Sequence, residues 1–552
     1  MASKYAQKAK MQNPAGATAN PGSENELCCV IGSGPAGVAC AQALLSRGRR
    51  VLMLDAGLTL EPSRQQLVES FRARSPEQWS AAELVDYKAG MTAEKDGVPV
   101  KLVYGSDYPY REAEQRLAIA YGEAGLRASL ARGGLSNVWG AAMMPYTQSD
   151  IADWPITIKN LAEHYAASLE LSGLAATPDA LENRFPLYTR RFTDLRPSKQ
   201  AERLLNTMDR HRQSLRAGGI EFGRSRLAVR GKAEEEGCVY CRLCMYGCPY
   251  GHIYSSAHSL PQLEKNAGFR YQGGVVVQSV QEIADTVQIT GTETSTGKES
   301  QWQCRRAFVA AGPLPTTAIL LRSLEAYDQP LSLKDSQYFL FPMLLLKKAR
   351  GARAEPLHAL SQIFLEMTRP PTEETLAHIQ IYTNSDLISE AVEKSFGPLA
   401  GMLSPIVKDM QDRMLIAQGF LHSHASSEIS VTLSKTEQGD RLILEPRINP
   451  QAAELARGVV WKLVKNGPRI GAIPLPPMLK ITEPGRSFHN GGTFPMSRDP
   501  KGFQTDLLGR LPAWKRVHAV DSTVFPSIAP TTITFTIMAN AHRIGWEAAT
   551  LE

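Results

Sequence analysis

The hydrophobic positions near the start of the chain predict a βαβ unit. Residues 26–31 (ELCCVI) form a short apolar run typical of a buried strand, and residues 51–57 (VLMLDAG) form a second one. Between them, residues 35–46 have the pattern of a helix that ends before Gly48. Residues 1–24 are small and polar, so we expect a disordered tail there.

Later patterns indicate more than one sheet. After residue 274 the stretches VVVQSV and TVQIT alternate like paired strands, and residues 305–323 resemble a strand, a tight glycine turn and a helix. From residue 326 to 484, β-like stretches such as YFLFPMLLL, HIQIYT and EISVTLS are interrupted by helical patterns. This suggests a separate sheet-containing domain.

The composition is that of an ordinary soluble globular protein, since 43% of the 552 residues are hydrophobic and 21% are charged. It excludes a disordered, collagenous or small disulfide-stapled chain. The net charge is +6, and the sequence contains no dense block of Lys or Arg. The charge therefore gives no support for nucleic acid as a partner. The longest apolar run, residues 338–346, is too short for a transmembrane helix, and we find no secretion signal. We therefore expect a cytoplasmic protein.

The sequence GSGPAG at residues 32–37 fits the GxGxxG pattern of dinucleotide-binding sites and lies between the first strand and the helix. Gly32 permits the tight turn, Gly34 lets the backbone approach a pyrophosphate, and Gly37 lets the helix pack on the strand. Asp55, at the end of the second strand, can accept hydrogen bonds from ribose hydroxyls. With strand, helix and acid in register, we predict a dinucleotide site rather than a chance glycine turn. The motif alone does not separate FAD from NAD.

Four of the eight cysteines, Cys238, Cys241, Cys244 and Cys248, follow the spacing C-x2-C-x2-C-x3-C-P. This is the bacterial-ferredoxin spacing for an iron–sulfur cluster. Structural zinc sites usually separate two cysteine pairs by a dozen or more residues, so zinc is a weaker alternative, beside a vestigial or disulfide loop. Because no second cysteine run exists, Cys248 either closes a [4Fe-4S] cluster or is left over from a three-iron cluster.

Several motifs later in the chain resemble those of the glucose-methanol-choline family of flavin oxidoreductases, in order from about residue 27 to the C-terminus. The resemblance implies that the dinucleotide is FAD. It also implies an α/β fold, in which a Rossmann-like FAD-binding domain is assembled from discontinuous segments beside an α+β substrate domain with an antiparallel sheet. The motifs are GGLSNVWGAAMMPY (133–146), DWPI (153–156), FVAAGPLPTTAILLRS (308–323), HNGGTFPM (489–496) and VDSTVFPSIAPTTITFTIMANAHRIG (520–545).

The resemblance further implies which residues contact the cofactor. The adenine is expected near Val277, and Asp521 matches the position that holds the ribityl chain. The loop with Gly133, Gly134 and Asn137 is expected to border the flavin, since adjacent glycines let the backbone approach a flat ring. The alternative is an ordinary glycine turn beside a core tryptophan. The full expected set is Gly32, Gly34, Gly37, Asp55, Gly133, Gly134, Asn137, Val277, Ala311 and Asp521.

His489 lies in HxxGTxxM, the pattern that carries the catalytic histidine in this family. An imidazole near the flavin can take the hydroxyl proton while the substrate carbon gives its hydride to flavin N5. Where the family usually has a second His or Asn, this chain has Thr532, which cannot act as a base at neutral pH. Either His489 works with a weaker helper, or the chemistry has moved away from simple alcohol oxidation.

These motifs divide the chain into a tail (1–24), a cap or substrate segment (151–225), a substrate-binding domain (326–480) and the FAD-binding domain. The three parts of the FAD-binding domain are residues 25–150, residues 226–325 with the cysteine-rich loop 237–258, and residues 481–552.

The sequence thus predicts an FAD-dependent dehydrogenase that oxidises a hydroxyl group of an alcohol, polyol or sugar to a carbonyl. An iron–sulfur cluster carries one electron at a time, so it favours a one-electron acceptor protein, such as a ferredoxin or cytochrome, over dioxygen. Two alternatives remain: a biosynthetic flavoenzyme with altered chemistry, and a redox-sensing protein. The His489 motif disfavours the sensor, because a sensor needs no base. Nothing in residues 326–480 identifies the substrate.

Overall fold

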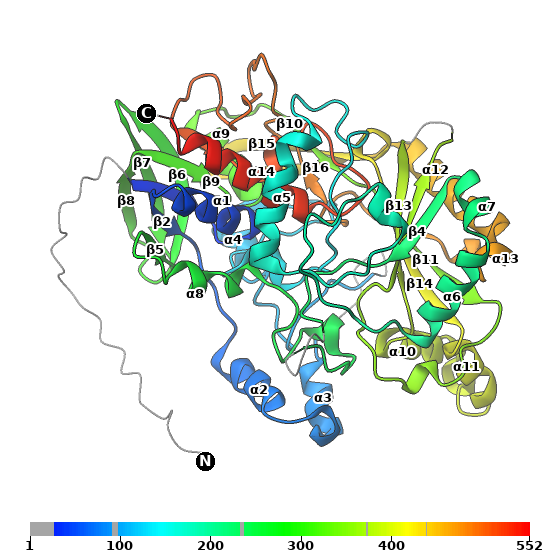
Figure 1. The fold of residues 1–552 in the computed structure, drawn as a ribbon. Helices are drawn as coiled ribbons and strands as arrows, with labels where there is room; N and C mark the ends of the chain where they lie inside the picture. Colours follow the sequence, from blue (N-terminus) through cyan, green and yellow to red (C-terminus); the bar gives the residue numbers. More distant parts are fainter. Residues whose placement is uncertain (1–26, 91–97, 232–236, 371–373, 438, 552) are drawn as a thin grey trace.

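The computed structural model describes residues 27–90, 98–231, 237–370, 374–437 and 439–551. A parallel sheet with its helices lies at one end of the molecule, and a larger antiparallel sheet lies at the other (Figure 1). The tail expected at residues 1–24 lies outside the described residues. No helix of the described segments is long and apolar enough to cross a membrane.

The parallel sheet is built from distant parts of the chain. Its strand order is β20 (Val517–Ala519), β9 (Arg306–Val309), β1 (Leu27–Ile31), β2 (Arg50–Leu54) and β5 (Phe269–Gln272). Nearly every residue of β1, β2 and β9 is buried, as expected for a parallel sheet covered on both faces. With α1 between β1 and β2, the expected βαβ unit is confirmed.

Helices and a small sheet surround the parallel sheet. α1 (Pro35–Ser46) packs against α14 (Thr534–Ala548), which also packs against α5 (Ile158–Ser172). α9 (Pro313–Ser323) follows β9 and contacts the neighbouring antiparallel sheet, so the expected strand, turn and helix are confirmed. That sheet consists of β6 (Val275–Ile283), β7 (Thr286–Glu293) and β8 (Glu299–Cys304).

The large sheet is antiparallel and has one strictly apolar face. Its order is β17 (Ala472–Pro474), β11 (Tyr338–Leu345), β14 (Met414–Leu421), β13 (Thr375–Tyr382), β12 (Ile363–Thr368) and β4 (Ile220–Arg224), with β18 (Lys480–Ile481) also on β11. Alternate residues of these strands form a buried cluster with α6 (Lys199–Arg210) and α12 (Pro450–Lys465). The other face carries buried polar side chains.

A fourth sheet completes the fold. It consists of β19 (Asn490–Gly491), β10 (Leu331–Asp335), β15 (Glu428–Thr436), β16 (Gly439–Arg447) and β3 (Ile119–Ala120). The strands of residues 326–480 are therefore distributed over two sheets rather than one. The remaining α-helices of the described residues are α4 (Ala113–Arg116), α7 (Arg212–Ala217), α8 (Leu260–Leu263), α10 (Asp386–Phe396), α11 (Ser404–Gln411) and α13 (Gly467–Ile470), besides α2 and α3.

The cysteine-rich loop is mostly irregular. It contains two 3₁₀ turns, Leu243–Tyr246 and Ser256–His258. α2 (Pro62–Arg72) and α3 (Ala81–Tyr87) cover it through a small core of their own. That core contains Phe71, Trp79, Tyr87, Leu243 and Tyr246.

Candidate active site

The glycine loop after β1 has the geometry that a phosphate site needs. A Cβ at Gly32 would lie 2.6 Å from the carbonyl oxygen of Ala310, and one at Gly37 would lie 2.0 Å from the oxygen of Gly32. At Gly34, by contrast, no atom lies within 4 Å of the Cβ position. Gly32 and Gly37 therefore allow close packing, and Gly34 leaves space at the N-terminus of α1. An anion fits at such an end because the backbone N–H groups there are unpaired.

Asp55 follows β2, as expected, and is fully engaged within the protein. Its carboxylate accepts hydrogen bonds from the Ser33 hydroxyl at 2.5 Å and from the Tyr271 hydroxyl at 2.9 Å, and the Ser33 N–H lies at 3.3 Å. Burial raises the pKa of Asp55, and these hydrogen bonds oppose the rise. A ribose hydroxyl would have to share the carboxylate with these donors, so its contact with a ribose stays a prediction.

Ser33 joins the glycine loop to the loop expected to border the flavin. Its hydroxyl accepts a hydrogen bond from the Gly133 N–H at 2.9 Å while it donates to Asp55. A Cβ at Gly134 would lie 3.5 Å from the Gly34 Cα, so the two loops lie face to face. The sequence did not single out Ser33, because the middle position of GxG carries no residue preference in the motif.

Two serines at the end of the cysteine-rich loop bind the same two loops. The Ser256 hydroxyl donates to the Ser33 carbonyl at 2.9 Å, and the Ser255 hydroxyl donates to Asn137 Oδ1 at 2.8 Å. The Asn137 amide in turn donates to the Gly134 carbonyl at 2.7 Å. Asn137 thus shapes the loop, and the cysteine-rich segment is fixed directly to the expected dinucleotide site.

Asp521 organises the turn after β9. One carboxylate oxygen accepts from the Gly312 N–H at 2.9 Å and the Thr316 hydroxyl at 2.6 Å, and the other accepts twice from Thr523. The turn contains Ala311, and Val277 is buried on the neighbouring β6. Because all four contacts of Asp521 lie within the chain, its expected role at a ribityl group is a prediction.

His489 precedes β19 and is placed beside the Asp521 segment. The backbone N–H groups of Gly492 and Phe494 donate to the carbonyls of Ser522 and Thr523. The imidazole stacks on Phe420 with 4.7 Å between ring centroids, and its Nδ1 is buried without a hydrogen-bond partner. Burial, together with the nearby His378, lowers the pKa of His489 to about 3. The ring is therefore neutral at physiological pH and can accept a proton. A buried nitrogen without a partner fits a site that receives a ligand.

Thr532 holds a backbone segment in place. Its hydroxyl accepts a hydrogen bond at 2.8 Å from the N–H of Met144, which belongs to the GGLSNVWGAAMMPY motif. The neighbouring Thr531 has a buried hydroxyl without a partner. Thr532 is thus engaged with the main chain, and a role beside His489 has no support from its contacts.

The four motif cysteines are all free thiols and lie near one another. Burial raises the pKa of the Cys244 thiol well above its usual value, and Cys238, Cys241 and Cys248 raise it further. Backbone N–H groups point at two of the sulfurs: that of Ala359 lies 3.3 Å from Cys244 Sγ, and that of His252 lies 3.4 Å from Cys248 Sγ. Within the described segments, no group of three or more His, Cys, Asp or Glu is arranged to hold a metal ion.

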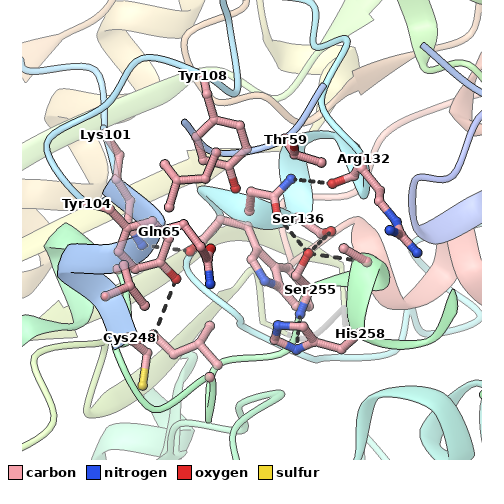
Figure 2. A pocket seen from close by; sticks show the side chains of 18 of the residues that line it. Thr59, Gln65, Lys101, Tyr104, Tyr108, Arg132, Ser136, Cys248, Ser255 and His258 are labelled. Atoms are coloured by element: carbon pink, nitrogen blue, oxygen red, sulfur yellow. Dashed lines mark hydrogen bonds between the residues drawn. The ribbon is translucent and has the colours of Figure 1, made fainter. Parts of the chain in front are cut away.

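A cavity of about 210 Å³ separates the cysteine loop from the loop expected to border the flavin (Figure 2). Ser136, Asn137 and Trp139 line one side, and Cys244 and Cys248 line another.

The cavity is cationic. Lys101 donates to the Trp139 carbonyl at 2.9 Å. Burial lowers the pKa of Lys101 to about 8, and the thiols of Cys244 and Cys248 oppose this. Arg72 and Arg132 also line the cavity, and its described lining contains no Asp or Glu. Such surroundings fit an anionic group held by the cysteines.

Neither a family model nor a curated protein sequence matches the chain. Among solved structures, the chain is similar to the crystal structure of pyridoxine 4-oxidase from Mesorbium loti, with a TM-score of 0.55 and 15% sequence identity. The alignment covers 94% of this chain and 98% of the other. At this identity the likeness concerns the fold alone. The expected α/β fold, with a discontinuous parallel sheet and a second antiparallel sheet, is confirmed.

Proposed function

We propose that the protein is an FAD-dependent oxidoreductase that oxidises a CH–OH group of a small alcohol, polyol or sugar to a carbonyl. The observation that carries the proposal is the convergence of three distant segments. Ser33 joins the glycine loop to the Gly133 loop. The backbone after His489 donates to the carbonyls of Ser522 and Thr523, next to Asp521. Asp521 in turn holds the turn after β9, against which Gly32 packs. The motif resemblance to the glucose-methanol-choline family and the fold of the pyridoxine 4-oxidase neighbour support the same class of reaction.

The chain offers a place for each part of the cofactor. Gly32, Gly34 and the start of α1 would hold the pyrophosphate, and Asp55 would lie at the ribose. When bound, FAD supplies the acceptor for the hydride of the substrate carbon.

His489 would take the proton of the substrate hydroxyl. Its imidazole is neutral, so the lone pair of one ring nitrogen is available at any physiological pH. The low pKa also means that the isolated site holds a proton poorly. A compensating negative charge nearby would therefore be needed in the reacting complex.

For the cysteine-rich loop we propose an iron–sulfur cluster. In a mononuclear site each sulfur lies about 2.3 Å from one ion, whereas the thiolates of a cluster bind different irons and lie further apart. The spacing of Cys238, Cys241, Cys244 and Cys248, the N–H groups aimed at two of the sulfurs and the ammonium of Lys101 support a cluster over zinc. When present, the cluster would pass single electrons from the flavin to a small one-electron acceptor protein.

The test combines cofactor analysis with a substrate screen. Acid precipitation of anaerobically purified protein should release FAD into the supernatant, and iron and sulfide should be found in comparable amounts. Pyridoxine, benzyl alcohol, glycerol and D-glucose are then mixed with the protein without oxygen, and loss of flavin absorbance is followed together with carbonyl formation. A protein that carries no flavin, or whose flavin is reduced by no hydroxyl compound in a wider panel, would contradict the proposal. Stoichiometric zinc without sulfide would contradict the cluster alone.

A further inference from the structure

The polar face of the seven-stranded sheet places an acid and a second histidine in one row with Phe420, the ring on which His489 stacks. The strand registers set Glu366 of β12 opposite His378 of β13, and His378 opposite Phe420 of β14. Cross-strand partners share one face of a sheet. The Phe420 ring stacks on the His489 ring, and His378 lies close enough to lower the pKa of His489.

Hydrogen bonds along the row of Tyr382, Gln380, His378 and Glu366 determine which ring nitrogen of His378 carries the proton. The Tyr382 hydroxyl donates to Gln380 Oε1 at 3.2 Å, so the Gln380 amide nitrogen faces His378 Nε2 at 3.3 Å. On the other side, His378 Nδ1 lies 2.5 Å from Glu366 Oε1, and both of these side chains are fully buried. An amide nitrogen can only donate, and a carboxylate only accepts. His378 therefore carries its proton on Nδ1, and its Nε2 presents a lone pair.

Nε2 is the weakly engaged nitrogen of His378. The contact of 3.3 Å from Gln380 is longer than an ordinary N–H hydrogen bond, whereas Nδ1 is held tightly. A carboxylate on one ring nitrogen makes the other a better proton acceptor, because it stabilises the imidazolium that forms. Glu366 Oε2 and His489 Nδ1 are both buried without a hydrogen-bond partner in the described structure. Buried polar atoms without partners indicate a place for an absent ligand.

The row also reaches the loop expected to border the flavin. The Tyr382 hydroxyl lies 3.4 Å from the position of a Cβ at Gly140, inside the GGLSNVWGAAMMPY motif. The row therefore spans the seam between the sheet and the FAD-binding side, which is where ligand sites of such proteins usually lie. The Thr532 hydroxyl, in contrast, is already engaged by the Met144 N–H.

We propose that His378, held by Glu366, is a second catalytic base of the reaction, in the role that Thr532 cannot fill. The substrate hydroxyl would lie between His489 and His378 Nε2, where it displaces the long contact from Gln380. The C–H bond breaks with its electron pair leaving as hydride to FAD, the O–H bond breaks, and the carbonyl forms. The proton stays on the imidazole pair, and the carboxylate of Glu366 supplies the compensating negative charge. This inference rests on the function proposed above.

The ionisable groups that face His378 can be named from each element around it. Glu366 lies on β12, Tyr382 lies further along β13, and His489 comes from the segment before β19. Beyond Glu366, the buried Arg226 is attracted to the same carboxylate. The only anion in this set is Glu366, so its removal should change the proton affinity of the histidine pair.

The test follows flavin reduction in the FAD-loaded protein by anaerobic stopped-flow. The probe is whichever of pyridoxine, benzyl alcohol, glycerol and D-glucose reduces the wild-type flavin fastest. His378→Asn, which can still donate to Glu366, should slow flavin reduction by about 10² to 10⁴, the range of one positioned base. Glu366→Gln keeps the hydrogen bond but removes the charge. It should lower the maximal rate and move the acid limb of the pH profile to lower pH.

The matched control is Ile379→Val, which lies between His378 and Gln380 on the same strand but faces the apolar cluster. It should leave the rate within about threefold, because it removes one methylene group from the apolar face and touches none of the polar row. FAD content and thermal unfolding are measured for each variant. His378→Asn with a near wild-type rate, or Glu366→Gln with an unchanged pH profile, would overturn the inference. A merely structural role would not move the acid limb.

A second measurement needs no substrate. In the FAD-loaded full chain with ¹⁵N-labelled histidine, NMR should detect a strongly downfield proton on His378 Nδ1 and an unprotonated Nε2. The downfield signal should disappear in Glu366→Gln and persist in Ile379→Val. If no hydroxyl compound reduces the wild-type flavin, the proposed function has failed and the catalytic role of His378 fails with it, whereas the spectrum still reports whether Glu366 fixes the His378 tautomer. A proton on Nε2, or no downfield signal in the wild type, would refute the inference.

Discussion

The different contacts of His489 and Thr532 predict opposite consequences for substitutions at these two positions. His489→Ala should slow substrate reduction of the flavin by about 10² to 10⁴ while FAD stays bound, because a neutral imidazole with an unpartnered Nδ1 is removed. Thr532→Val should instead lower stability and leave the rate within about tenfold. The two substitutions therefore separate a proton acceptor from a residue that holds the backbone.

The size of the Thr532 effect follows from one hydrogen bond. The Met144 N–H is fully buried and donates to Thr532 Oγ1 at 2.8 Å, and valine has nearly the same shape as threonine but no acceptor. An N–H left without a partner inside a protein costs about 1–3 kcal/mol. The matched control is Thr531→Val, whose hydroxyl is equally buried but has no partner in the protein. It should cost clearly less.

Both quantities can be measured on the same FAD-loaded preparations. Anaerobic stopped-flow gives the rate of flavin reduction, and thermal unfolding followed by flavin fluorescence gives the order of stability. We expect His489→Ala to rank lowest in rate, and Thr532→Val to rank below Thr531→Val in stability. If Thr532→Val slows reduction more than His489→Ala, the proton does not go to His489 and the alternative of altered chemistry gains support. Equal stability of the two threonine variants would refute the hydrogen-bond argument.

Three further predictions concern the cofactors and pH. Ser33→Ala should weaken FAD retention on gel filtration by about 5- to 150-fold. The reason is that about 1–3 kcal/mol is lost when Asp55 and the Gly133 N–H lose their shared partner. Ser46→Ala, on the exposed end of α1, is the control, and equal FAD retention by the two variants would contradict the prediction. Cys244→Ser should remove iron and sulfide but leave FAD bound, whereas Cys304→Ser should keep both; iron retained in Cys244→Ser would exclude it as a ligand. Burial lowers the pKa of His358 and His518 to about 3 in the folded chain, from about 6.5 when unfolded. The unfolded chain then binds more protons between these values, so the free energy of unfolding should fall as the pH drops below about 6.5, by up to about 1.4 kcal/mol per pH unit for each histidine. His358→Gln should flatten this slope in thermal unfolding between pH 7 and 5, and an unchanged slope would speak against the assignment.

Short-range patterns in the chain were sufficient for the dinucleotide loop and for the cysteine loop. The βαβ unit with Gly32, Gly37 and Asp55 could be predicted because strand, turn and helix are each encoded within a few residues. The same holds for the ferredoxin spacing, in which the four thiols come from one short loop. His489 was found through a motif of eight residues.

The partners of these residues were not predictable, because they come from remote parts of the chain. The Met144 N–H meets Thr532 across 388 positions, and Ser256 meets Ser33 across 223. Without the fold, Thr532 could be compared only with the residue type usual at its position, and its hydroxyl was considered as a helper of His489.

Glu366 and His378 illustrate the same limit. By sequence alone they are two polar residues in strand-like stretches, separated by 12 positions. A shift of one residue in the pairing of β12 with β13 would turn one of them to the apolar face. Only the register of three adjacent strands places them in one row beside Phe420 and His489. The sequence by itself determined which local elements form and which reactive residue types they carry. The tertiary structure decided which side chains meet, because strand register and loop contacts depend on the packing of the whole chain.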